Sequence, residues 1–346
     1  METRQVCTGC LKNVVEESRS IIADIINADK NEIFFTSGGT EGDNWAVKAE
    51  SLKRKHGHII VSSIEHHAVT ESALWLKNYG IDVTFAPVDE QGIVKLEQLE
   101  KMIRNDTFLI SVMLANNEIG TIQPIENVFE IAHEYGAKVH SDAVAAFGHI
   151  DVDVKKLGVD FLNVSGHKIC GPKGVGFLYV RGGKPERFMH GGGQENGLRA
   201  GTENVAGIAG LATAARIAYE TLSDRARQEK RISDYMIKRI LREIPYSRLN
   251  GSRECRVTGN MNFSFQYVNG GMLVVMLNKQ GICASAGSAC TSNSGKPSHV
   301  LLALGLDEKI AEGSLRLTIN HTITHREADY VVECIKKDVA RLRELA

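Results

Sequence analysis

The feature that most constrains the fold is an alternation of short apolar runs and helical stretches between about residue 30 and residue 180. The apolar runs are rich in Val, Ile and Phe. Strands that alternate with helices in this way form a mostly parallel sheet covered by helices. The pattern predicts an α/β fold with seven strands, at 33–36, 58–62, 82–87, 109–115, 138–141, 161–164 and 176–180.

A second region with a different pattern follows. Long helices are predicted at 206–218 and 225–243 from small residues, apolar periodicity and charge. After them, strands are predicted at 261–268, 283–284 and 314–319, separated by helices at 271–279 and 328–345. This order predicts a large domain over residues 1–222 and a smaller C-terminal α+β domain over residues 223–346.

The charge balance and the cysteines exclude several classes of function. With 41 basic and 42 acidic residues in 346, the chain has no net field to attract nucleic acid or an anionic membrane. We find no signal-like apolar segment near Met1 and no apolar run of membrane-spanning length, so a cytoplasmic location is expected.

The seven cysteines indicate reduced thiols. Cys7 and Cys10 form an isolated C-x-x-C, which leaves packing, redox and metal-binding interpretations open.

Polar groups follow several strands at the point where each strand ends. The first strand leads through Ser37-Gly38-Gly39-Thr40 into a helix, a turn that lets a phosphate approach free N–H groups. The other strand ends carry Glu65-His66-His67, Asn116-Asn117-Glu118, Asp142 and Ser165-Gly166-His167-Lys168. Each residue alone has an ordinary structural interpretation. Together they occupy one rim of the predicted sheet, where open α/β sheets bind ligands.

This set of residue types matches what pyridoxal 5'-phosphate (PLP) chemistry requires. Lys168 could form the Schiff base, and Asp142 could keep the pyridine nitrogen protonated. The imidazole of His66 fits the position of the ring that stacks on the pyridine face. The phosphate could be held by Thr40, Ser165 and His167, with Gly39 allowing close approach.

Five segments resemble the cysteine desulfurases of the NifS and IscS type, which belong to the class V aminotransferase group of fold type I PLP enzymes. These segments lie in the same order as in that family and are F-T-S-G-G-T-E-G-D-N (35–44), A-N-N-E-I-G (115–120), S-G-H-K-I-C-G-P-K-G (165–174), G-G-G-Q-E-N-G-L-R-A-G-T-E-N (191–204) and A-S-A-G-S-A-C-T-S (284–292). The resemblance implies a PLP-dependent transferase whose large domain binds PLP and whose small domain carries the catalytic cysteine loop.

The resemblance also implies a role for each matching residue. Lys168 matches the Schiff-base lysine, His66 the stacking and acid–base histidine, and Asp142 the partner of the pyridine nitrogen. Thr40, Ser165 and His167 match phosphate donors. Thr202 matches a threonine that reaches the phosphate of a partner subunit, which implies a homodimer. Asn117, beside the cofactor, and Arg316 match residues that hold the substrate carboxylate.

By the same resemblance, Cys290 is the nucleophile that takes sulfur from L-cysteine, leaving L-alanine and an enzyme persulfide. A glycine- and serine-rich loop would let its thiolate move between the cofactor and an acceptor. Residues 291–306 resemble the long-looped branch that serves iron–sulfur cluster assembly or tRNA thiolation. The expected partner is therefore a sulfur-acceptor protein, either an iron–sulfur scaffold or a tRNA-thiolation enzyme. No resident metal is expected, although Cys290 could ligate iron during transfer.

The chain departs from the family pattern in three places. Family members usually carry a Y-L-D-N-A-A-T-T segment and then G-N-P-S-S-x-H before the region matched here, and this sequence has neither, so a more open site is expected. Ala145 stands where a glutamine usually bonds the PLP phenolic oxygen, a bond worth about 0.5–1.5 kcal/mol. Cys170 stands where a tyrosine is common.

Two other functions fit the same residues. One is a selenocysteine lyase or another PLP β-lyase, whose activity would survive the loss of Cys290. The other is an N-terminally truncated homologue with impaired activity that acts as a binding partner. Cysteine desulfurase activity is the leading hypothesis, because Lys168, Asp142 and Cys290 occur together.

Overall fold

The computed structural model describes residues 2–287 and 297–345, without the side chains of residues 2–8. The chain divides into two compact units. The first contains Met1–Ala86, Lys95–Leu114 and Gln123–Leu222, and the second contains Pro87–Val94, Ala115–Ile122 and Ser223–Ala346. The segments Pro87–Val94 and Ala115–Ile122 therefore group with the second unit, although they lie within the first 222 residues of the chain.

The first unit is built on a seven-stranded sheet in the order β1-β7-β6-β5-β4-β2-β3. Only β7 runs against its neighbours, pairing antiparallel with both β1 and β6. The predicted mostly parallel sheet is thus confirmed. The strands are β1 (Ile33–Thr36), β2 (Gly57–Ser62), β3 (Ile81–Ala86), β4 (Thr107–Ser111), β5 (Lys138–Asp142), β6 (Phe161–Ser165) and β7 (Gly176–Val180).

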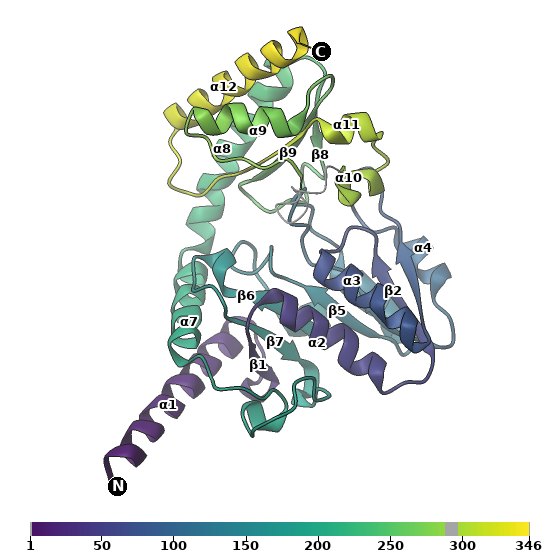
Figure 1. Cartoon of the computed structure of the whole chain (residues 1–346), viewed down its shortest axis with the longest axis vertical. Coiled ribbons are helices and arrows are strands. Elements are labelled where there is room, and N and C mark those ends of the chain that lie inside the picture. The colour runs from purple at the N-terminus through teal and green to yellow at the C-terminus, as the bar shows by residue number, and fades with distance from the viewer. Residues whose placement is uncertain (1, 288–296, 346) are drawn as a thin grey trace. The chain divides into compact units, whose positions relative to one another are not determined.

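Helices cover this sheet because their apolar faces are buried against it. Helix α2 lies beside β5, β6 and β7, and Trp45 on α2 packs edge-on against Phe34 of β1 with ring centroids 5.7 Å apart. Helices α1 and α7 lie side by side (Figure 1). The α-helices of this unit are α1 (Glu2–Ile25), α2 (Gly39–Leu52), α3 (His67–Leu76), α4 (Leu96–Met102), α5 (Ile125–Glu134), α6 (Val154–Leu157) and α7 (Val205–Glu220), and its 3₁₀ turns are η1 (Lys30–Glu32), η2 (Lys77–Tyr79), η3 (Gly166–Ile169), η4 (Arg181–Gly183) and η5 (Glu195–Gly197).

The second unit contains a three-stranded antiparallel sheet in the order β10-β9-β8. Its strands are β8 (Ser247–Asn250), β9 (Asn260–Phe265) and β10 (Ser314–Thr318). Its helices are α8 (Leu222–Glu243), α9 (Gly270–Lys279), α10 (His299–Ala303), α11 (Glu308–Glu312) and α12 (His325–Glu344). Phe263 and Phe265 of β9, Met236 of α8 and Ile335 of α12 belong to one buried core.

In this unit the sequence missed one strand and wrongly predicted another. Strand β8 was not predicted, because its sequence S-R-L-N lacks the β-branched and aromatic residues typical of strands. The predicted strand at 283–284 is absent from the described chain. Near it, Ser285 makes only an isolated bridge to Arg316 of β10. Within 2–287 and 297–345, no helix has both the length and the apolar composition needed to cross a bilayer.

Candidate active site

The candidate site begins at the buried carboxyl end of β5. Asp142 is the last residue of β5 and is 4% exposed, and its Oδ1 accepts a hydrogen bond of 2.8 Å from the backbone N–H of Val144. Burial, and then the nearby carboxyl of Asp43, raise the pKa of Asp142 to about 8. The positive charge of Lys168 lowers the pKa of Asp142, so this charge lies close enough to interact with the carboxyl. A buried carboxyl of this kind is suited to hold or share a proton.

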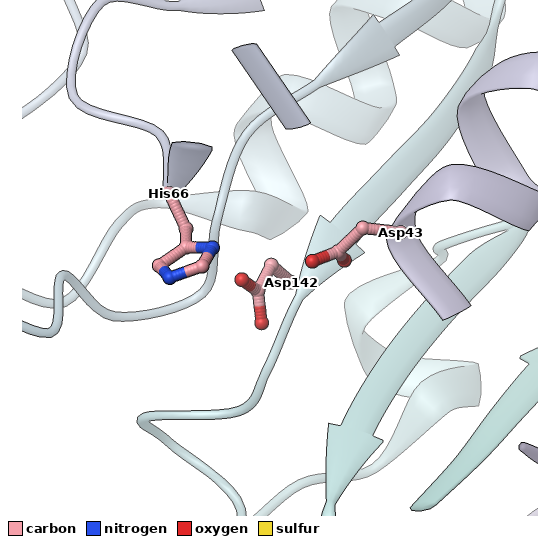
Figure 2. Close-up of side chains that lie close together, drawn as sticks. All are labelled: Asp43, His66 and Asp142. Carbon is pink, nitrogen blue, oxygen red and sulfur yellow. The ribbon is translucent and has the colours of Figure 1, made fainter. Parts of the chain in front are cut away.

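His66 lies beside this carboxyl at the start of the neighbouring helix α3. Figure 2 shows its imidazole next to Asp142, with Asp43 on the other side of Asp142. Each of the three residues offers a ligand atom within 4.8 Å of the other two. His66 Nδ1 accepts a 3.1 Å bond from the Ala68 N–H, so the proton of the neutral ring lies on Nε2. The ring is therefore fixed by the helix start.

The turn between β1 and α2 has the features of a phosphate site. No side chain caps the start of α2, whose N-cap Gly38 has φ 140°. A Cβ at Gly39 would lie 3.0 Å from Val144 Cγ2, so glycine allows this turn to approach the strand ends closely. Thr40 is exposed in the first helical turn. A helix start with free N–H groups is where phosphates bind in proteins.

Strand β6 leads to the remaining predicted residues. Ser165 Oγ and His167 Nδ1 are 2.9 Å apart, and a Cβ at Gly39 would be 3.7 Å from Ser165 Cβ. The side chain of Lys168 is exposed in η3, directly after β6. Lys168 is thus accessible, as a Schiff-base lysine must be before the cofactor arrives. The residues of this unit fit PLP: a carboxyl for the ring nitrogen, an imidazole beside it, an accessible lysine and a phosphate turn.

Thr202 is not part of this cluster. It lies in the loop before α7, in a cavity of about 200 Å³ lined also by Thr36, Ser37 and Arg199. The sequence resemblance assigns Thr202 to a site in the partner subunit, and that role stays a prediction.

The second unit brings the two predicted substrate-binding residues together. Arg316 of β10 donates from Nη1 to the backbone carbonyl of Asn117 at 3.1 Å. The backbone of Arg316 also pairs with Ser285, at the base of the predicted cysteine loop. Cys290 itself lies outside the described residues, as does the side chain of Cys7.

Three polar residues of the site were not assigned a role from the sequence. Asp43 is buried in the first half of α2, His140 on β5 and Asn163 on β6. Asp43 shares one face of α2 with Ala46 and Glu50, and packing in the fold buries that face. A charged residue inside a helix is more often solvated, so it was passed over.

The same cluster has the geometry of a candidate cation site, since Asp43, His66 and Asp142 converge. A cation would require both carboxyls to be ionised. Burial, the first cause for each, raises the pKa of Asp43 and of Asp142 to about 8, which favours their protonated forms at neutral pH. Both carboxyls are therefore suited to exchange protons near neutral pH.

Comparisons with known proteins agree with this chemistry. A profile of the family "Aminotransferase class-V" matches residues 6–331. Cysteine desulfurase IscS of Methanosarcina thermophila is 47% identical over 338 residues, covering 97% of this chain and 83% of the relative, and the IscS of Clostridium botulinum strain Hall is 46% identical, covering 97% and 86%.

Solved structures give the same result. A NifS-like protein superposes with a TM-score of 0.88 at 38% identity, covering 96% of this chain and 88% of the other. The structure of SspA in complex with cysteine superposes with a TM-score of 0.80 at 35% identity, covering 90% and 88%. The chain belongs to the class-V aminotransferase family and, within it, to the cysteine desulfurases.

Proposed function

We propose that this protein is a PLP-dependent cysteine desulfurase that removes sulfur from L-cysteine. The single observation that carries the proposal is the buried Asp142 carboxyl at the end of β5, with His66 beside it and the charge of Lys168 nearby. A cysteine-bound structure among the relatives supports this substrate.

The residues of the first unit have separate tasks in this proposal. When bound, PLP supplies an electron sink that weakens bonds at the substrate Cα. Lys168 would hold the cofactor covalently, and its amine would accept or return a proton. Asp142 would keep the ring nitrogen protonated, and His66, whose neutral ring carries its proton on Nε2, would bind the ring and move a proton. Gly39, Thr40, Ser165 and His167 bind the phosphate.

The second unit supplies substrate recognition and the sulfur acceptor. The guanidinium of Arg316, held at the Asn117 carbonyl, binds the substrate carboxylate together with the Asn117 side chain. Cys290 attacks the substrate sulfur. The substrate Cβ–Sγ bond breaks as a bond forms between that sulfur and Cys290 Sγ, and a proton goes to Cβ. The products are L-alanine and a Cys290 persulfide, so atoms and electrons balance.

The finer setting follows the family. We infer a homodimer in which Thr202 reaches the partner's phosphate, a cytoplasmic location, and a sulfur-acceptor protein that serves iron–sulfur cluster assembly or tRNA thiolation. The relatives named IscS support this assignment.

Alanine release from L-cysteine tests the function. We expect PLP-loaded protein to form alanine and, with a thiol reductant, sulfide in equal amounts. Lys168→Ala should abolish both products and the visible absorbance of lysine-bound cofactor. Cys290→Ala should keep that absorbance and lose desulfuration. A Cys290→Ala variant that keeps full activity would instead indicate a β-lyase or selenocysteine lyase, and cofactor-loaded wild-type protein without turnover would refute an enzyme.

A further inference from the structure

Asp43 is a buried acid of the site with no assigned role. It is 1% exposed, and its Oδ1 accepts a 2.8 Å bond from Asn163 Nδ2. The imidazole of His140, with Nε2 3.4 Å from the same oxygen, is its one ion-pair neighbour in the described chain. No lysine or arginine of that part of the chain pairs with it.

His140 does not supply a positive charge. It is fully buried, and burial lowers the pKa of His140 to about 4, so the ring is neutral at neutral pH. Its Nδ1 lies 2.8 Å from Ser111 Oγ, a neutral hydroxyl. An ionised Asp43 would therefore be a buried charge held by one amide alone, an arrangement that costs several kcal/mol.

Two more acids surround Asp43. Asp142 lies within 4.8 Å, and the buried Glu65 also interacts electrostatically with both aspartates. Burial, then these two neighbours, raise the pKa of Glu65 well above its usual value. His66 also lies beside the two aspartates, and the charge of Lys168 acts on Asp142. Neighbouring carboxylates in a nonpolar interior do not all ionise, and their protons are shared among them.

We propose that Asp43 is a positioning residue for the cofactor ring: it keeps a proton, stays neutral, and leaves Asp142 as the single negative charge that faces the ring nitrogen. The proposal rests on the proposed PLP function and deepens it. The charge of Lys168 acts on Asp142 and favours its ionised form, and a ring cation would do the same, whereas no such charge acts on Asp43 among the described residues. A second carboxylate at Asp43 would leave one buried negative charge uncompensated.

A small residue makes room for this arrangement. A Cβ at Gly42 would fall 1.8 Å from Asn163 Oδ1, so only glycine at 42 lets the Asn163 amide reach Asp43. Asn163 Nδ2 also donates to the Gly39 carbonyl at 2.8 Å. One amide thus joins the phosphate turn to the Asp43 carboxyl, which fixes the position of that carboxyl.

Infrared difference spectroscopy of the PLP-loaded protein tests this directly. Wild type minus Asp43→Asn at neutral pH should show the C=O stretch of a protonated carboxyl, displaced in heavy water, while the band of Glu65 cancels. The exposed control Asp224→Asn, whose side chain is 87% exposed, should not remove that band. Loss of only carboxylate stretches in Asp43→Asn would overturn the proposal.

A second variant keeps the test decisive if Asp43→Asn does not fold. The Asn163 amide favours the ionised form of Asp43, so its bond lowers the pKa of Asp43. Asn163→Ala should therefore move the pH at which the protonated band disappears upward, and an unmoved midpoint would overturn the proposal. Failure of the wild-type protein to take up PLP would overturn both proposals, whereas loaded protein without the band would overturn this one alone.

Discussion

Two groups of charged residues in this protein follow opposite electrostatic rules. In the first unit, Asp43, Asp142 and Glu65 are buried together, and the pKa of each is raised, first by burial. In the second unit, the carboxyl of Glu243 on α8 lies 2.9 Å from Arg239, and that hydrogen bond lowers the pKa of Glu243 well below its usual range.

The difference in pKa direction distinguishes residues of a candidate site from residues that only stabilise the fold. Arg239 of α8 also pairs with Asp329 of α12 at 2.7 Å, so these residues form an ion-pair network between the two helices. Each charge in this network has a partner of opposite charge, and the pairs lie near solvent. Such a network stabilises modestly. The carboxyls of the acid cluster are buried side by side, which raises their pKa values, so the cluster holds protons at neutral pH. Electrostatic frustration of this kind marks functional sites.

The largest expected effect is on the pH dependence of stability. The folded-state pKa of Asp43 is raised to about 8, so the native protein binds a proton there that the unfolded chain releases. The stabilising contribution is present below the unfolded pKa and is lost as pH rises toward about 8. In cofactor-free full-length protein, the unfolding free energy contributed by Asp43 should fall by on the order of 3 kcal/mol between about pH 5 and pH 9.

Urea unfolding of wild type and Asp43→Asn at both pH values measures this difference. The comparison within each pH cancels the opposing contribution of His140, whose pKa is lowered to about 4 by burial. Equal pH dependence in the two proteins would contradict the idea that the cluster holds protons.

The next effect is on catalysis. Asp142→Asn removes the charge proposed to keep the ring nitrogen protonated, while keeping the size of the side chain. Loss of a hydrogen bond to a charged group costs about 1.5–3 kcal/mol, so the rate of alanine formation should fall about 10–150-fold. Steady-state kinetics with Asp224→Asn as the exposed control measures this effect. An unchanged rate would contradict a catalytic role for Asp142.

The smallest effect is expected in the ion-pair network. Arg239→Ala should reduce the unfolding free energy by about 1 kcal/mol or less, and the loss should shrink at high salt because the pairs lie near the surface. Arg227→Ala is the matched control, since Arg227 pairs with Asp224 while 79% exposed. A loss of several kcal/mol in Arg239→Ala would contradict this, because the network would then affect the unfolding free energy as much as the buried acid cluster does.

The sequence predicted most where apolar runs marked the strands and polar residues followed those strands. The seven strands of the large sheet were predicted to within a few residues because buried parallel strands are continuous apolar runs. Asp142, His66 and Lys168 were predicted because they follow strands, and strand ends converge. Strand β8 and Asp43 were missed for a common reason: S-R-L-N and a charged helix residue have no local preference for burial, and only tertiary packing buries them.

The most direct measurement of the central claim is to reduce PLP-loaded protein with borohydride and to locate the attached pyridoxyl group by peptide mass spectrometry. The account predicts one modified residue, Lys168, with the modification lost in Lys168→Ala and weakened in Asp142→Asn. Attachment to another lysine in the wild-type protein, with Lys168 unmodified, would contradict the site described here.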